Sequence, residues 1–166
     1  MQKSLKEIIK QIATLEQQKE EVLNDEVQNS ITRHENNEDI PVSDYNFIAI
    51  REEIGSIDKK TRYLRHKLHV SNATVQIPEF SITIGECIIM MAQLSKEQTL
   101  LKRMARKENK ERRQLGFGNT VEWVTLNYDK DECRNKLKEI SEKLTSLQIT
   151  IDRTNLTHLV DVEIFE

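Results

Sequence analysis

The feature that most constrains the fold is a motif that occurs twice, 83 residues apart. His69–Ile77 and Asp152–Val160 share an asparagine and a threonine at matching places, and each segment leads from a helical pattern into a β-branched run. Carried backwards, the same offset aligns two series of apolar residues with helical spacing. We therefore interpret the chain as a duplicated unit in which a long helix leads into a strand.

The apolar residues of the helical segments form narrow stripes, which favours long helices packed in pairs. Hydrophobic residues make up 37% of the chain and charged residues 32%, with 4 Gly and 2 Pro, which suits amphipathic helices better than a compact sandwich. The clearest stripe keeps the three-four spacing of a coiled coil over about three heptads. Its members are Phe47, Ile50, Ile54, Ile57, Thr61, Leu64 and Leu68.

Local signals predict four helices, and the last three begin at capping residues. The predicted helices are about Ser4–Asn24, Ser43–His69, Thr83–Lys110 and Asp129–Thr154. The loop Asp25–Pro41 should join the first two as an antiparallel hairpin. The predicted strands are Ala73–Ile77, Val121–Leu126 and His158–Phe165, with a turn at Gly116–Gly118.

These elements predict a mainly α fold with an internal duplication. Two long antiparallel helical hairpins, with four helices and coiled-coil-like seams, should carry a small β-sheet of short strands where the repeated motif ends each half. We expect one domain over 1–166, with a helix-loop-helix-strand half at about 1–80 and a helix-strand-helix-strand half at about 81–166.

Composition and motifs favour a cytoplasmic protein without catalytic chemistry. The net charge of −3 argues against general attraction to nucleic acid or to an anionic membrane, and the N-terminus lacks the apolar core of a signal peptide. Cys87 and Cys133 fall in helical patterns, as reduced thiols do. His66 and His69 lie one helical turn apart, but no spacing supplies further metal ligands. We therefore expect no enzyme activity, no cofactor, no metal and no membrane partner.

The leading hypothesis is an interaction or scaffolding protein, because narrow seams bury little surface within one chain and a homo-oligomer would bury more. The candidate residues for self-association are Trp123, Val124, Leu159, Val160, Val162 and Ile164.

The alternative is a nucleic-acid-binding accessory protein that uses the basic end of the third helix. Glu108 and Glu111 are interleaved with its cations, which makes nucleic acid the less favoured partner. The candidate residues are Arg103, Arg106, Lys107, Arg112 and Arg113.

Three short segments resemble the septicolysin-like family of small bacterial proteins. They are Asn72-Ala73-Thr74, the run Ser81-Ile82-Thr83-Ile84 before the third helix, and the ending Ile151–Thr157. The resemblance extends from the second helix onward and to the general character of the first. It implies long helical hairpins with short strands, a cytoplasmic location and no established catalytic residues. The lytic activity in the family's name is not carried over, because the chain shows no secretion signal and no segment that would insert into a membrane.

Overall fold

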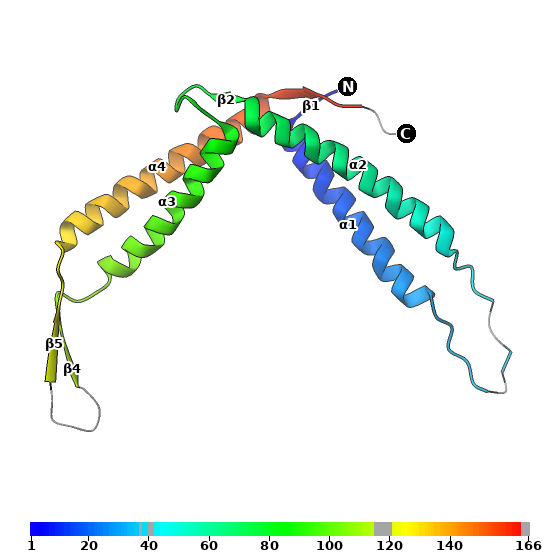
Figure 1. Ribbon diagram of the computed structural model, residues 1–166, viewed down its shortest axis with the longest axis horizontal. Coiled ribbons are helices and arrows are strands. Elements are labelled where there is room, and N and C mark those ends of the chain that lie inside the picture. Colours follow the sequence, from blue (N-terminus) through cyan, green and yellow to red (C-terminus); the bar gives the residue numbers. More distant parts are fainter. Residues whose placement is uncertain (37, 40–41, 115–120, 164–166) are drawn as a thin grey trace. The chain divides into compact units, whose positions relative to one another are not determined.

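The computed structural model describes residues 1–36, 38–39, 42–114 and 121–163, and Figure 1 shows their helices and strands. The helices are α1 (Leu5–Asn29), α2 (Phe47–Thr74), α3 (Ile84–Ala105) and α4 (Lys130–Thr157). The strands are β1 (Gln2–Ser4), β2 (Gln76–Ile77), β3 (Ile82–Thr83), β4 (Lys110–Gln114), β5 (Val121–Thr125) and β6 (Leu159–Asp161). The predicted mainly α fold is confirmed. Among the described residues, no helix has both the length and the apolar character needed to cross a bilayer.

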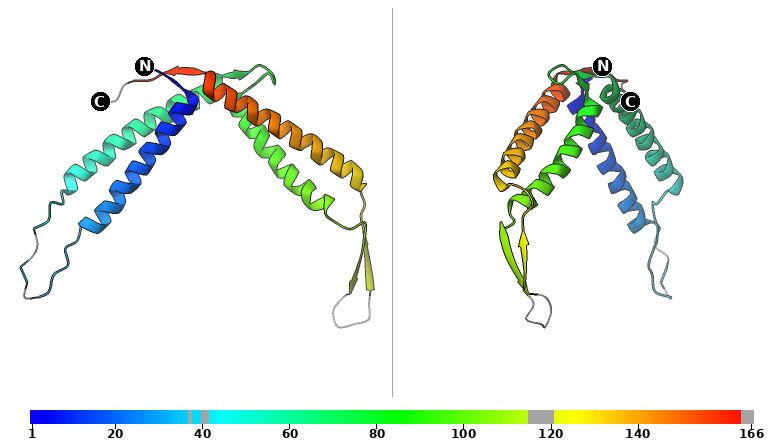
Figure 2. Two further views of the ribbon diagram at one scale, coloured as in Figure 1. Left: turned by 180° about the vertical axis from the view of Figure 1, so that it is seen from behind. Right: turned by 60° about the vertical axis from the view of Figure 1, so that its left-hand side comes forward.

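The chain divides into two compact units. The first comprises residues 1–75 and 153–166, and the second comprises residues 76–152. The boundary lies slightly before the junction of the two repeat halves, and the C-terminal residues return to the first unit. Each unit contains one pair of long helices, and both pairs can be followed in the two views of Figure 2.

In the first unit, α1 and α2 form the antiparallel hairpin that the sequence predicts. Three ion pairs join the helices, and the residue numbers fall along α2 as they rise along α1. Glu16, Lys19 and Glu26 of α1 pair with Arg65, Asp58 and Arg51 of α2, respectively.

Within the apolar stripe of α2, Ile57 and Leu64 are buried, whereas the other members are at least partly exposed. Leu64 is 1% exposed and belongs to the core of the first unit, together with Leu5 and Ile8 at the start of α1. Phe47, at the opposite end of the same stripe, is 57% exposed. The core of the hairpin therefore lies toward β1, and the end of the hairpin next to its loop is exposed to solvent.

In the second unit, α3 and α4 lie side by side (Figures 1 and 2). The Gln98 side chain donates to the Ser141 hydroxyl at 2.9 Å, and the Cys133 thiol donates to the Leu101 carbonyl at 3.7 Å. Leu147 is fully buried, as are Ile84 and Cys87 at the start of α3. Burial also raises the pKa of the Cys87 thiol, which makes this thiol a poor nucleophile. Both cysteines are free and buried.

Several predicted helix ends are wrong. The N-cap of α2 is Asn46, whose side chain accepts from the Ala49 amide, whereas the Ser43 hydroxyl accepts from the Tyr45 amide within the loop. α1 and α2 both continue past their predicted ends. α3 stops at Ala105 instead of Lys110, because the residues from Lys110 onward pair as a strand.

The strands form three separate two-stranded ribbons instead of one sheet. β1 pairs with β6, β2 with β3 and β4 with β5, all antiparallel. β6 pairs with β1 over Leu159–Asp161 only, so His158, Val162 and Glu163 of the predicted strand lie outside β6. The last two residues of the predicted strand, Ile164 and Phe165, lie outside the described residues. The predicted strand Ala73–Ile77 shrinks to Gln76–Ile77, because α2 continues to Thr74.

The local structures of the two repeats correspond closely. α1 and α3 each begin with a capping box, formed by Ser4 with Glu7 and by Thr83 with Glu86. In both boxes the backbone N–H and the hydroxyl of the capping residue donate to the glutamate, which lowers the pKa of its carboxyl. The ribbons match as well. Leu159 corresponds to Gln76 under the 83-residue offset, and Leu159 pairs with the capping residue Ser4 as Gln76 pairs with the capping residue Thr83. We infer that the chain is a duplication in which the first strand of each repeat pairs with the last strand of the other.

Candidate functional site

The two repeats differ most in the segment between their helices. A loop joins α1 to α2, whereas the segment between α3 and α4 carries the β4–β5 ribbon (Figure 1). The Leu126 amide donates to the Asn109 carbonyl at 3.2 Å, and the Tyr128 hydroxyl donates to the Met104 carbonyl at 2.8 Å. The first bond extends the ribbon ladder by one pair, and the second links the segment after β5 to the last turn of α3. Because the described residues between α1 and α2 form no such ribbon, the β4–β5 ribbon is the leading candidate for a functional site.

The register of the ribbon sorts its side chains onto two faces. Arg112 lies opposite Trp123, and Lys110 lies opposite Thr125. Since successive side chains of a strand point to opposite faces, Lys110, Arg112 and Trp123 share one face, while Glu111 and Glu122 lie on the other. The register therefore separates Lys110 and Arg112 from Glu111 and Glu122, whereas the position of Arg113 lies opposite Glu122.

Every residue of β5 is exposed to solvent. Trp123 is 58% exposed, although tryptophan is the side chain that gains most from burial. The Lys110 ammonium lies 4.5 Å from the centroid of the Trp123 ring, a cation–π contact. A two-stranded ribbon with this much exposed apolar surface is marginally stable in water by itself.

The backbone of β5 also has an open edge, because within the described residues β5 pairs only with β4. The Leu126–Asn109 bond marks a hydrogen-bonded pair, and such pairs alternate along an antiparallel ladder. The amides of Glu122 and Val124 therefore point toward β4, and those of Trp123 and Thr125 point toward the open edge. This edge can accept a further strand.

The structure separates the cations that the nucleic-acid hypothesis grouped together. Only Arg112 is placed beside Trp123. Lys107 lines a small pocket of about 270 Å³ that Glu108 and Glu111 also line. Arg103 lies in the last turn of α3 and Arg106 caps that helix. Arg113 lies in β4, but its side chain, like the predicted turn Gly116–Gly118, lies outside the described residues.

The candidate residues for self-association also separate. Trp123 and Val124 are exposed on opposite faces of β5, and Leu159 in β6 is 54% exposed. Val160 is half-buried opposite Lys3. Val162 is 4% exposed and its amide donates to the Met1 carbonyl. Both its side chain and its amide are therefore engaged within the first unit and are not free for self-association. Ile164 lies outside the described residues.

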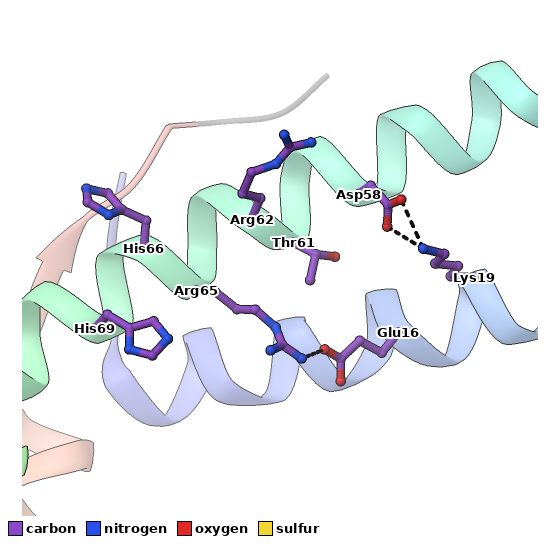
Figure 3. Close-up of a pocket in the computed structure, with 8 residues that line it drawn as sticks. All are labelled: Glu16, Lys19, Asp58, Thr61, Arg62, Arg65, His66 and His69. Atoms are coloured by element: carbon purple, nitrogen blue, oxygen red, sulfur yellow. Dashed lines mark hydrogen bonds and ion pairs between the residues drawn. The ribbon is translucent and has the colours of Figure 1, made fainter.

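A second candidate is an open groove of about 730 Å³ on the α1–α2 hairpin (Figure 3). Figure 3 shows the ion pairs Lys19–Asp58 and Glu16–Arg65 bridging the two helices beside it. His66 and His69 line the groove, but the described residues contain no group of three possible metal ligands. Because the paired side chains are about one-third to one-half exposed, each pair stabilises the hairpin weakly.

Thr61 lines the same groove, and its hydroxyl oxygen is buried without a hydrogen-bond partner among the described residues. A buried hydroxyl without a partner destabilises a fold by about 1 to 3 kcal/mol. We expect Thr61→Val, which keeps the side-chain shape, to raise the free energy of unfolding by about 1 kcal/mol in urea denaturation. Thr74→Val is the matched control, because the Thr74 hydroxyl is exposed and donates to the Val70 carbonyl. If Thr61→Val destabilises the protein, the hydroxyl has a partner in solution.

The fold places the chain among mainly α proteins built from paired helical hairpins with short strands. No protein-family model matches it, and no curated protein is significantly similar in sequence. Its structure is similar to the crystal structure of a functionally unknown conserved protein from Corynebacterium diphtheriae. The two chains are 15% identical with a TM-score of 0.69, and the match covers 97% of this chain and 100% of the other. This likeness concerns the fold alone.

Proposed function

We propose that the protein is a non-enzymatic interaction protein of the cytoplasm that self-associates through the open edge of β5. The observation that carries this proposal is a strand of five residues, all exposed, with outward-pointing amides at Trp123 and Thr125. Antiparallel pairing of β5 with its copy would extend the ribbon into a four-stranded sheet around a two-fold axis. The sequence resemblance to the septicolysin-like proteins is compatible with this role, and we propose that relationship as well.

The β5 edge is a better candidate than β6. β5 offers five exposed residues, whereas β6 has three, of which Val160 is half-buried. A strand pairing of this length buries less surface than a standard protein interface. We therefore expect a weak, concentration-dependent dimer. Its formation would stabilise a ribbon that is marginal in isolation.

Proline at Thr125 tests this proposal without removing a bond of the ribbon. The Thr125 amide points to the open edge, so its loss spares the β4–β5 ladder but blocks an added strand. We expect the wild-type protein to form dimers as its concentration rises, and the Thr125→Pro variant to remain monomeric, in light scattering coupled to size-exclusion chromatography. Thr125→Val is the matched control, because it changes the side chain and keeps the amide.

Two results would contradict the proposal. The first is a wild-type mass that stays monomeric at every concentration, and the second is a Thr125→Pro variant that dimerises as the wild type does. Integrity of the ribbon is checked by the short Hα–Hα distance between Arg112 and Trp123, which NMR detects in a non-hydrogen-bonded pair. If Arg112→Pro alone prevents dimerisation, the interface lies on the edge of β4 instead.

A further inference from the structure

We infer that the ribbon face bearing Lys110, Arg112 and Trp123 binds single-stranded nucleic acid, with a base stacked on Trp123 and phosphates held by the two cations. This inference rests on a face of the ribbon, whereas the proposed dimer uses its backbone edge. The two can therefore succeed or fail separately.

The first argument is the separation of charge across the ribbon. In sequence, Lys110 and Arg112 alternate with Glu111, which would weaken their attraction for a phosphate chain. The register places Glu111 and Glu122 on the opposite face from Trp123. The Arg112 side chain is exposed to solvent. The Trp123 face is thus cationic and the opposite face carries the carboxylates.

The second argument is the position of the aromatic ring. Trp123 lies in the middle of β5, directly across from Arg112 and in contact with the Lys110 ammonium. The ring is still 58% exposed. Proteins that bind single strands combine such rings with a cationic track, because every base has a face that can stack. Stacking of this kind requires an unpaired base, which favours a single strand over a duplex.

The third argument is the local concentration of charge. Between Lys102 and Thr125 the sequence contains seven Lys or Arg residues and three Glu, a net charge of +4, although the whole chain carries −3. The rest of the molecule is correspondingly acidic. A polyanion is therefore attracted to this segment and repelled elsewhere, which directs it to the ribbon.

Trp123 is the only tryptophan in the chain, so its fluorescence reports directly on this face. We would titrate the full-length protein with an oligothymidylate of about 16 nucleotides, the upper range of known single-strand sites. We expect saturable quenching and an affinity that falls as salt rises. Inorganic polyphosphate of matched charge should displace the oligonucleotide without quenching to the same extent, because it has no bases.

Single substitutions test each contact, and the affinity of each variant is measured by the fluorescence anisotropy of a labelled oligonucleotide. Trp123→Ala should weaken binding about 10-fold or more. Arg112→Ala and Lys110→Ala should each weaken binding. Each should also reduce the magnitude of the slope of log K against log salt by about one. Glu122→Gln, on the opposite face, and Lys136→Ala, in α4, are the matched controls and should leave that slope unchanged. Thr125→Pro should lose the dimer but keep the wild-type salt slope, because Thr125 lies opposite Lys110 on this face but carries no charge; this result separates the binding site from the dimer edge.

The inference is overturned if the oligonucleotide causes no quenching, or if polyphosphate quenches equally. It is also overturned if Arg112→Ala and Trp123→Ala bind with the wild-type affinity. Equal binding of a matched duplex that leaves Trp123 fluorescence unchanged would show that only phosphates are recognised, and would refute stacking.

Discussion

Replacing Leu64 with alanine should lower the free energy of unfolding of the first unit by about 3 kcal/mol. Leu64 is 1% exposed in the core formed with Leu5 and Ile8, so truncation removes apolar contacts and leaves a cavity that rigid helices fill poorly. The change is measured by urea denaturation followed by circular dichroism. Hydrogen exchange of α1 and α2 peptides then locates the loss.

Phe47→Ala is the control for this prediction, because Phe47 belongs to the same apolar stripe in sequence but is 57% exposed. We expect that variant to lose less than about 1 kcal/mol. Similar losses for the two variants would mean that the hairpin core continues to its loop end, against the burial described above.

The second large effect is expected at Leu147, which corresponds to Leu64 under the 83-residue repeat and is fully buried in α4. Leu147→Ala should also lower the free energy of unfolding by about 3 kcal/mol, because it removes an equivalent core side chain. Hydrogen exchange should show faster exchange in α3 and α4. Comparable losses at Leu64 and Leu147 would support the duplication in energetic terms.

Ile149→Ala is the matched control in α4, since Ile149 is 55% exposed two residues away. A small loss is expected there. If Leu147→Ala is no more harmful than Ile149→Ala, the buried face of α4 is assigned wrongly and the repeat alignment fails with it.

The parts of the fold that could be predicted from sequence are those set by local chemistry. The capping box of Thr83 and Glu86 is confirmed, because its hydrogen bonds join residues three positions apart. Asp129 likewise accepts from the amides of Asp131 and Glu132 at the start of α4, as predicted, and this lowers the pKa of its carboxyl. The β-branched and aromatic residues of Val121–Thr125 also form a strand, as their propensity predicts.

The parts that could not be predicted depend on pairing between distant residues. β4 has the sequence Lys-Glu-Arg-Arg-Gln, whose residues are good helix formers, so it reads as the end of a charged helix. It becomes a strand because β5 supplies the hydrogen-bonding partner. One sheet was expected instead of three ribbons for the same reason, since no local signal tells a strand which partner it will pair with.

The sequence identifies some residues of the candidate site but does not bring them together. The sequence assigns Trp123 to self-association and Arg112 to nucleic-acid binding, and it places Lys110 at the end of the predicted third helix. The missing step was to pair Lys110–Gln114 with Val121–Thr125 and assign alternate residues to alternate faces. Once the ribbon register is known, period-two alternation brings Lys110, Arg112 and Trp123 together.

The pairing of β1 with β6 has a consequence for the order in which the protein folds during its synthesis. The second unit, residues 76–152, is continuous in sequence, so it can complete its internal contacts without the segments that flank it. The first unit is discontinuous, because Gln2–Ser4 must wait for Leu159–Asp161. Because β1 precedes β6 in the chain, a nascent chain exposes the unpaired edge of β1 until β6 has been synthesised.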